Sequence, residues 1–298
     1  MAKMKIDTTQ GLTSEQVSII SKVVNDVFLF STYTFVVHPL RGRVHFNLYP
    51  YQKSVLYQFI KNRFNIILKF RQAGITELIS MYCLWLAMYH PNSKINIISI
   101  KDSTAKKVLK KIKFMYKNLP AFLQVPIING RSGEYGSASM MEFENGSFIE
   151  SIPTSSEAGR SESLTLLVID EAAIVRWAHQ IWAAAFPTLS TGGAAIINST
   201  PMGMGNFYHS TWVNAISGGN SFNAIRLFWR MHPERNDEWY EQMASALGPR
   251  RTAQEIDGDF LSSGNTVFDM VDIKAIEDCL MDYPIIKRRY NGQYLQFL

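Results

Sequence analysis

The sequence predicts an α/β fold in which a mostly parallel sheet is flanked by helices. Short apolar runs typical of strands alternate along the chain with longer segments of helical periodicity. Two of these runs, 164–169 and 194–199, are apolar almost throughout, as expected of strands covered on both faces. The 298 residues suffice for one large domain of this class with a small appendage.

The first half of the chain alternates predicted helices with predicted strands. An apolar stripe that runs from Val17 to Phe28 indicates the first helix, and Pro120 follows the end of the last one. Residues 65–69 are short and apolar, and isoleucine recurs through 94–100, so both segments are predicted strands. The predicted order is helix 14–30, helix 51–62, strand 65–69, loop 70–74, helix 75–89, strand 94–100 and helix 103–119.

The second half begins with a hairpin signal. Residues 139–152 alternate in polarity around Asn145-Gly146, a dipeptide that favours a tight turn between antiparallel strands. After 262–264, which read Ser-Ser-Gly, the pattern weakens into a tail. The predicted order after the hairpin is strand 164–169, strand 194–199, helix 205–217, strand 222–229, helix 236–246 and helix 250–258.

Composition excludes several classes of protein. Hydrophobic residues make up 47% of the chain and charged residues 18%, which is typical of a globular core. The longest apolar runs fall short of the roughly 18 residues that span a membrane, and no signal-like stretch follows the first lysines. Cys83 and Cys279 lie far apart, as buried free thiols would. A net charge of +5 and a pI of about 9.1 are compatible with nucleic-acid binding without requiring it.

Residues 69–76, Lys-Phe-Arg-Gln-Ala-Gly-Ile-Thr, have the pattern of a phosphate-binding loop between a strand and a helix. N–H groups at a helix N-terminus attract anions, and Gly74 lets the backbone approach the phosphates. Thr76 would give its hydroxyl to Mg²⁺, while Lys69 or Arg71 would neutralise the β- and γ-phosphates. The usual lysine is replaced by Ile75, so an ordinary structural turn remains the alternative. The residues expected to line the phosphates are Arg71, Gln72, Ala73, Gly74, Ile75 and Thr76.

The apolar run 164–169 ends in two carboxylates, Asp170 and Glu171. At the carboxyl end of a buried strand, Asp170 would hold Mg²⁺ and Glu171 would act as general base on the attacking water. The alternative is a pair of acids that merely favours the dipole of a following helix. Because both motifs occur in the expected order, nucleotide hydrolysis is the favoured interpretation.

Two short motifs fit the same site. Tyr51 and Gln52 precede the loop, and their ring and amide could pack on and hydrogen-bond to adenine. Thr200 lies in a Ser-Thr-Pro sequence at the end of the run 194–199 and could sense the γ-phosphate. A helix start and a turn are the structural alternatives.

With these motifs in place, the chain resembles the large terminase subunit of tailed phages, the ATPase of the DNA-packaging motor. The resemblance covers roughly residues 45–268. It implies an ASCE-type P-loop NTPase fold with a small helical lid region. The matching segments are Tyr51-Gln52 (adenine motif), 69–76 (a deviant Walker A), 169–171 (Walker B), 199–201 (coupling motif) and 153–161, which carries an arginine.

The resemblance also implies residue roles. Some family members carry the phosphate lysine at the first position of the loop, so Lys69 is the expected phosphate lysine and Arg71 a second cation. Arg160 is the candidate arginine finger, which would act on the nucleotide of a neighbouring subunit. A solvated loop arginine is the alternative for Arg160.

The resemblance further implies partners and boundaries. We expect ATP and Mg²⁺ as cofactors. We expect double-stranded DNA, the capsid portal protein, the small terminase subunit and further copies in a ring as partners, without a membrane. The chain would act in the host cytoplasm, transiently docked on the procapsid. The expected organisation is an N-terminal helical region (1–45), an ATPase core with lid elements (46–262) and a tail (263–298) leading to an absent nuclease domain, so no nuclease activity is expected.

DNA contact is expected at a lysine-rich helix, and two other functions remain open. Lysines along 101–117 suit binding to a phosphate backbone, although a solvated helix face is the alternative. A helicase-like ATPase would need further motifs that the sequence does not show. A degenerate P-loop that binds nucleotide or DNA without hydrolysis is the second alternative. Its only support is Ile75, which stands in place of the usual lysine. The lysines are Lys101, Lys106, Lys107, Lys110, Lys111, Lys113 and Lys117.

Overall fold

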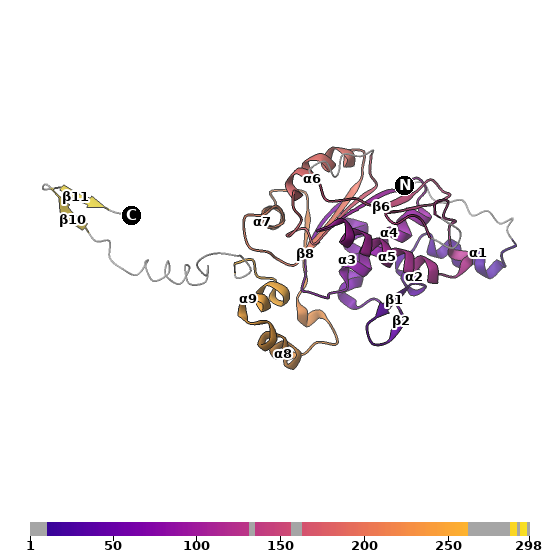
Figure 1. Ribbon diagram of the computed structural model, residues 1–298, viewed down its shortest axis with the longest axis horizontal. Helices are drawn as coiled ribbons and strands as arrows, with labels where there is room; N and C mark the ends of the chain where they lie inside the picture. The colour runs from indigo at the N-terminus through magenta and orange to yellow at the C-terminus, as the bar shows by residue number, and fades with distance from the viewer. Residues whose placement is uncertain (1–10, 131–134, 156–162, 262–286, 291–292, 297–298) are drawn as a thin grey trace.

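A seven-stranded sheet forms the centre of the molecule (Figure 1). The computed structural model describes residues 11–130, 135–155 and 163–261, and the backbone of 287–290 and 293–296. The strand order is β5-β6-β4-β7-β8-β3-β9, and β5–β6 is the antiparallel pair in an otherwise parallel sheet. The prediction of a mostly parallel α/β sheet is therefore confirmed. The strands are β3 (Phe64–Leu68), β4 (Lys94–Ile98), β5 (Met140–Glu142), β6 (Phe148–Ser151), β7 (Leu166–Asp170), β8 (Ala194–Ser199) and β9 (Asn223–Arg226).

The sheet order brings the two predicted motifs together. Strand β8 lies between β3 and β7, with Leu68 opposite Ser199 and Asp170 opposite Asn198. The carboxyl ends of these parallel strands therefore meet at one edge of the sheet, which is where ligands bind in such folds. The loop after β3 and the acidic pair after β7 both begin at this edge.

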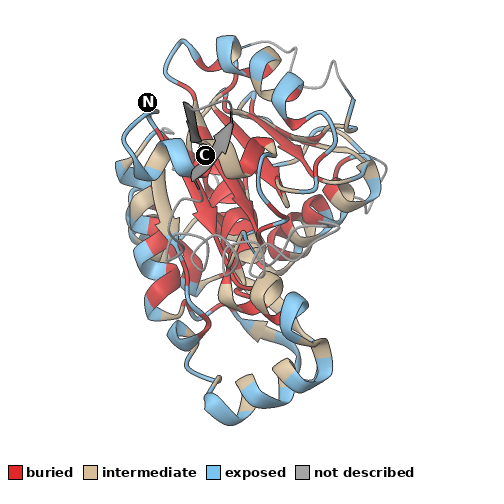
Figure 2. Ribbon diagram, turned by 90° about the vertical axis from the view of Figure 1, so that its left-hand side faces the viewer, coloured by how far each residue is buried: buried red, intermediate tan, exposed pale blue. Residues whose placement is uncertain are grey.

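Helices cover both faces of the sheet. One buried cluster joins α1–α5 to one face, and a second joins α6 and α7 to the other. Figure 2 shows the buried residues concentrated in the sheet and in the sides of the helices that face it. The helices are α1 (Ser14–Val23), α2 (Val27–Thr32), α3 (Pro50–Lys61), α4 (Ile75–Tyr89), α5 (Asp102–Asn118), α6 (Ala178–Ala185) and α7 (Phe207–Ile216), with 3₁₀ turns η1 (Ala121–Leu123) and η2 (Phe186–Leu189).

Helix α4 is the most deeply buried helix of the fold. Of its 15 residues, only Thr76 and Glu77 are not buried. Both lie in its first turn, so the polar and accessible part of the helix is its N-terminus, next to the phosphate loop. This arrangement leaves the helix dipole and free N–H groups of α4 available at the sheet edge.

The N-terminal region departs from the prediction. The single helix expected at 14–30 is wrong, because the chain turns between α1 and α2. The Asp26 carboxylate accepts hydrogen bonds from the N–H groups of Phe28 and Leu29 at 2.8 and 3.1 Å and so caps a new helix. A hairpin of β1 (Phe35–His38) and β2 (Gly42–His45) follows, which the sequence reading did not predict.

Residues 227–261, called the lid below, follow β9 and contact the phosphate loop. The lid contains η3 (Trp229–Met231), α8 (Asp237–Leu247), α9 (Pro249–Thr252) and η4 (Ala253–Asp257), a π-helical turn. The predicted helix 236–246 is thus confirmed, while 250–258 divides into two short turns. None of the 11 residues of α8 is buried, so the lid is largely exposed in Figure 2.

The described part of the C-terminal region is a hairpin of β10 (Lys287–Tyr290) and β11 (Gln293–Gln296). The rest of the predicted tail 263–298 lies outside the described residues. Across the described residues, no helix is both long enough and apolar enough to cross a membrane.

Candidate nucleotide-binding site

The loop between β3 and α4 has the backbone geometry that a phosphate requires. Gly74 caps α4 with a left-handed φ of 68°, and Gln72 is also left-handed with a φ of 59°. The left-handed φ favours glycine at this position, and a Cβ added there would lie 2.5 Å from Nε2 of Gln52, which would have to move. The loop therefore turns sharply into the N-terminus of α4, where N–H groups can point at an anion.

Lys69 lies inside this site and contacts the acidic pair. Its side chain is only 7% exposed, and its Nζ donates to Oε1 of Glu171 at 2.8 Å. Its backbone N–H donates to the carbonyl of Ser199 at 3.1 Å, which ties the start of the loop to β8. Lys69, the expected phosphate cation, thus lies beside Glu171, the expected general base.

Asp170 is buried against the start of α4. The Thr76 hydroxyl donates to the Asp170 carboxylate, at 3.3 and 3.4 Å from its two oxygens. Burial raises the pKa of Asp170 and Glu171 adds to the rise, while Lys69 opposes it. A carboxylate and a hydroxyl in contact are the oxygen ligands that Mg²⁺ prefers, so this donor set suits the expected cation. Within the described ranges, no three His, Cys, Asp or Glu side chains gather into a metal site.

Glu171 holds an unusual backbone conformation. Its φ is 56°, in the left-handed region that non-glycine residues rarely occupy. The next two N–H groups, of Ala172 and Ala173, donate to the carbonyl of Asn198 and to Oγ of Ser199. These bonds hold the strained turn and direct the Glu171 side chain, which is 28% exposed, toward Lys69.

Arg71 faces the lid. Its side chain is 68% exposed and lies 3.2 Å from Oε2 of Glu255. Its backbone N–H also donates to the Glu255 carbonyl at 2.6 Å. The two loop cations are therefore in different environments, since Lys69 is buried at the sheet edge and Arg71 lies at the surface.

Tyr51 and Gln52 lie against the loop from the start of α3, and both are buried. The Tyr51 hydroxyl donates to the Ala73 carbonyl at 2.8 Å. The Gln52 amide donates to the same carbonyl at 3.3 Å, and its oxygen accepts from the N–H of Tyr49 at 3.0 Å. An adenine contact would have to replace part of this bonding. Thr200, the remaining predicted residue, is buried directly after β8.

Asn198 and Glu255 are site residues that sequence analysis missed. The Asn198 amide is fully buried opposite Asp170 and lowers the pKa of that carboxyl, although neither amide atom makes a well-formed hydrogen bond among the described residues. A polar residue inside the apolar run 194–199 was a signal for it. Glu255 had no comparable signal.

Two predicted features are not among the described contacts of this site. Arg160 lies outside the described residues. On α5, Lys106 pairs with Asp102, Lys111 pairs with Glu77, and Lys113 donates to the Ser137 carbonyl. These intramolecular partners reduce the charge that the helix can offer to a phosphate backbone.

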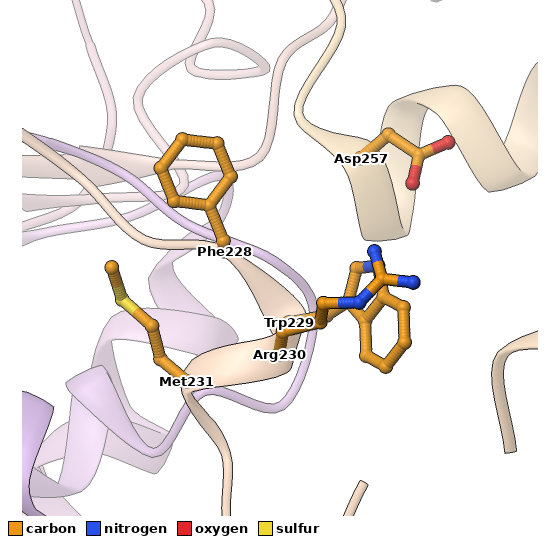
Figure 3. A pocket seen from close by; sticks show the side chains of 5 residues that line it. All are labelled: Phe228, Trp229, Arg230, Met231 and Asp257. Carbon is orange, nitrogen blue, oxygen red and sulfur yellow. The ribbon is translucent and has the colours of Figure 1, made fainter. Parts of the chain in front are cut away.

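An open pocket of about 540 Å³ lies on the lid rather than at the phosphate loop. Figure 3 shows its lining, Phe228 to Met231 on one side and Asp257 on the other. The pocket contains none of the predicted site residues, so we do not assign the nucleotide to it.

The family comparison matches most of the described core. The model of the family described as terminase large subunit, T4likevirus-type, N-terminal, matches residues 66–275. The terminase large subunits of Thermus phage G20c and Thermus virus P23-45 are each 31% identical over 132 residues, which is 38% of this chain and 26% of theirs. The match thus spans about a quarter of the length of these relatives.

Solved structures show the same fold. The large terminase ATPase domain of Thermus phage P74-26 superposes with a TM-score of 0.56 at 20% identity, covering 72% of this chain and 94% of that one. The large terminase of a thermophilic bacteriophage, in complex with ADP, gives a TM-score of 0.58 at 13% identity, covering 72% of this chain and 54% of that one. The large terminase of bacteriophage HK97 gives a TM-score of 0.57 at 15% identity, covering 85% of this chain and 52% of that one.

Proposed function

The chain belongs to the terminase large-subunit family, and we propose that it binds ATP at the edge formed by β3, β7 and β8 and hydrolyses it. The observation that carries the proposal is the contact between Lys69 and Glu171, which joins the two predicted motifs at 2.8 Å. The large terminase of the thermophilic bacteriophage, which has the same fold, forms a complex with ADP. Residues 46–262 would make up this ATPase core, after an N-terminal region at 1–45.

In this proposal the phosphates lie on the backbone of residues 71–76, with the N–H groups of 72–76 as donors, because the N–H of Arg71 donates to the Glu255 carbonyl. The dipole of α4 and the Lys69 ammonium would neutralise their charge, and Arg71 would add a second, more exposed cation. Mg²⁺, when held by Thr76 and Asp170, would neutralise further phosphate charge. Tyr51 and Gln52 would bind adenine after exchanging part of their bonding to the loop, and Thr200 would contact the γ-phosphate.

Hydrolysis would begin with a change of partner for Lys69. When the ammonium moves to the phosphates, the Glu171 carboxylate loses its hydrogen-bond donor and can accept a proton from water. The water oxygen bonds to the γ-phosphorus, the bond to the bridging oxygen breaks, and ADP and phosphate are the products. Until nucleotide arrives, the Lys69–Glu171 pair keeps both groups occupied.

We propose that hydrolysis drives packaging of double-stranded DNA into a capsid. Further copies in a ring, the portal protein and the small terminase subunit would be the partners, and Arg160 would act across the ring on a neighbour's nucleotide. The site of action would be the host cytoplasm, with transient docking on the procapsid.

Steady-state release of phosphate tests the proposed ATPase. We expect Mg²⁺-dependent hydrolysis by the chain, with or without stimulation by double-stranded DNA. Removal of Mg²⁺ with EDTA should abolish it. If the chain binds ATP but releases no phosphate even with DNA and portal present, the proposed hydrolysis is wrong and a binding module remains.

A further inference from the structure

One lid arginine holds two carbonyl groups of the phosphate loop. Nη2 of Arg235 donates to the carbonyls of Arg71 and Gln72, at 3.1 and 3.4 Å. Arg235 is separated from them by more than 160 residues and belongs to no motif that we identified. It is therefore a contact between the lid and the nucleotide site that the family motifs do not describe.

The guanidinium of Arg235 is fixed between two aromatic rings. Its Cζ lies 4.6 Å from the ring centre of Phe70, in the loop, and 4.3 Å from that of Trp239, on α8. Its backbone N–H donates to the His232 carbonyl at 3.1 Å. Stacking of this kind limits the rotation of the guanidinium and so directs its N–H groups at the loop.

The direction of the loop carbonyls decides whether the loop can bind an anion. N–H groups that point at a phosphate require the carbonyls of the same peptides to point away from it. Gln72 is left-handed, which is a strained conformation for a residue other than glycine, so a flip of an adjacent peptide can relieve strain once its carbonyl is free. A flipped carbonyl would repel a phosphate. Arg235 holds the first two carbonyls, and Tyr51 holds the third, that of Ala73.

Simple packing of the lid does not explain an arginine here. Nη1 of Arg235 is buried and has no hydrogen-bond partner among the described residues. A buried N–H group without a partner costs free energy, and an apolar side chain would pack between Phe70 and Trp239 without that cost. The contact that an apolar residue could not make is the pair of hydrogen bonds to the loop.

We infer that Arg235 is a positioning residue, which keeps the phosphate loop in its anion-binding conformation and makes that conformation depend on the docked lid. The consequence for nucleotide affinity rests on the proposed ATP site. The order of the loop itself can be measured without any ligand.

Hydrogen exchange of the peptide 69–77 tests the structural part. In Arg235→Ala we expect its amides to exchange at least fivefold faster than in the wild type, because two carbonyls lose their donor and the loop samples flipped peptides. Arg230→Ala is the matched control, since Arg230 also stacks on a lid tryptophan, Trp229, but pairs with Asp237 of the lid instead of with the loop. It should leave the exchange of 69–77 unchanged.

Affinity for MgADP tests the functional part. We expect the Kd of Arg235→Ala to rise about tenfold, since the loop must be ordered on binding, and that of Arg230→Ala to stay within about twofold. Arg235→Lys should fall between them, because a lysine can donate to one carbonyl but cannot stack as a planar group. In ATP hydrolysis, KM should rise with little change in kcat, as expected for a contact made equally in ground and transition states.

Each remaining outcome decides the inference. Unchanged exchange of 69–77 in a folded Arg235→Ala overturns it, and so does faster exchange confined to α8 or spread evenly over the chain. If Arg235→Ala does not fold, the exchange of Arg235→Lys decides by the same criteria. A wild type that binds no MgADP rejects the proposed function, whereas the exchange result still reports on Arg235.

Discussion

The charged residues at the sheet edge and those on the lid differ in their access to water. At the edge, the side chain of Lys69 is 7% exposed and pairs with Glu171. On the lid, the two partners of the pair Arg230–Asp237 are 69% and 75% exposed. Both pairs have a short N–O contact, so a contact distance alone does not distinguish them.

Access to water determines how strongly a charged side chain can act on its partner. A pair exposed to water is screened and contributes about 0–1 kcal/mol to stability. A buried pair is screened much less, and removal of one partner leaves the other charge without compensation. Lys69 at the sheet edge would therefore act strongly on a phosphate charge. An exposed lid pair such as Arg230–Asp237 would contribute little to stability or to binding. Four variants test this contrast between buried and exposed charge.

The largest effect should come from Lys69→Ala. We expect kcat/KM for MgATP to fall by about 100-fold or more, because the buried ammonium is the cation best placed to neutralise the phosphates. Initial rates of phosphate release over a range of ATP concentrations measure this. Lys61→Ala, at the exposed end of α3, should match the wild type. If hydrolysis survives the loss of Lys69, then Lys69 is not the cation that neutralises the phosphates.

Glu171→Gln should separate binding from chemistry. The amide keeps the size of the side chain but cannot take a proton, so we expect kcat to fall about 100-fold while the Kd for MgATP stays within a fewfold of wild type. Single-turnover hydrolysis and equilibrium binding measure the two quantities. The exposed lid variant Glu238→Gln is the control. An equal loss of binding and turnover would indicate that Glu171 holds the loop rather than the water.

Asp170→Asn should stabilise the metal-free protein. Burial raises the pKa of Asp170 above its ordinary value of 3.8, so the folded state binds more protons than the unfolded state between these two pKa values. Stability is therefore lost as pH rises through this window, and the neutral variant avoids that loss. In EDTA near pH 7 we expect a gain of about 1 kcal/mol in the free energy of unfolding.

The dependence on pH provides the control for Asp170→Asn. Its advantage over the wild type should shrink as pH falls and vanish only below 3.8, where Asp170 is protonated in both the folded and the unfolded wild type. Asp237→Asn, on the exposed lid, should change stability by no more than about 0.5 kcal/mol at either pH. Denaturant unfolding measures both. A variant less stable than the wild type at neutral pH would show that the carboxylate is stabilised by its partners.

Residues near in sequence or set in a strong motif could be predicted, and contacts between distant segments could not. The continuous apolar runs indicated β7 and β8 because strands covered on both faces leave that pattern. Gly74 and Asp170 stood out because a tight turn and a strand-end carboxylate have recognisable local sequences. These local signals sufficed for the sheet and for most of the site edge.

The lid contacts had no such signal. Glu255 and Arg235 approach the loop from more than 160 residues away, and single charged residues in a polar helical region usually lie in solvent. The break at Asp26 was missed because its apolar stripe continues across the break, although aspartate is a common helix cap. The pairing of Lys69 with Glu171 required the strand order, which sequence periodicity does not determine.

Arg71→Ala should lower activity much less than Lys69→Ala, and it tests the contrast within a single loop. Arg71 is 68% exposed and paired with Glu255, so its charge is screened and its loss should lower kcat/KM only about threefold to tenfold. Glu255→Gln should have a smaller effect still, because the backbone bond from the Arg71 N–H to the Glu255 carbonyl remains.

The rates of Arg71→Ala and Lys69→Ala at low and high salt measure the difference in screening between the two cations. A screened cation should contribute less as salt rises, so the gap between wild type and Arg71→Ala should narrow, while that for Lys69→Ala should not. The opposite result would be a fall in kcat/KM for Arg71→Ala as large as that for Lys69→Ala and insensitive to salt. It would indicate that Arg71 leaves Glu255 and enters the buried site when nucleotide binds. The exposure of Arg71 in the free protein would then be a poor guide to its role.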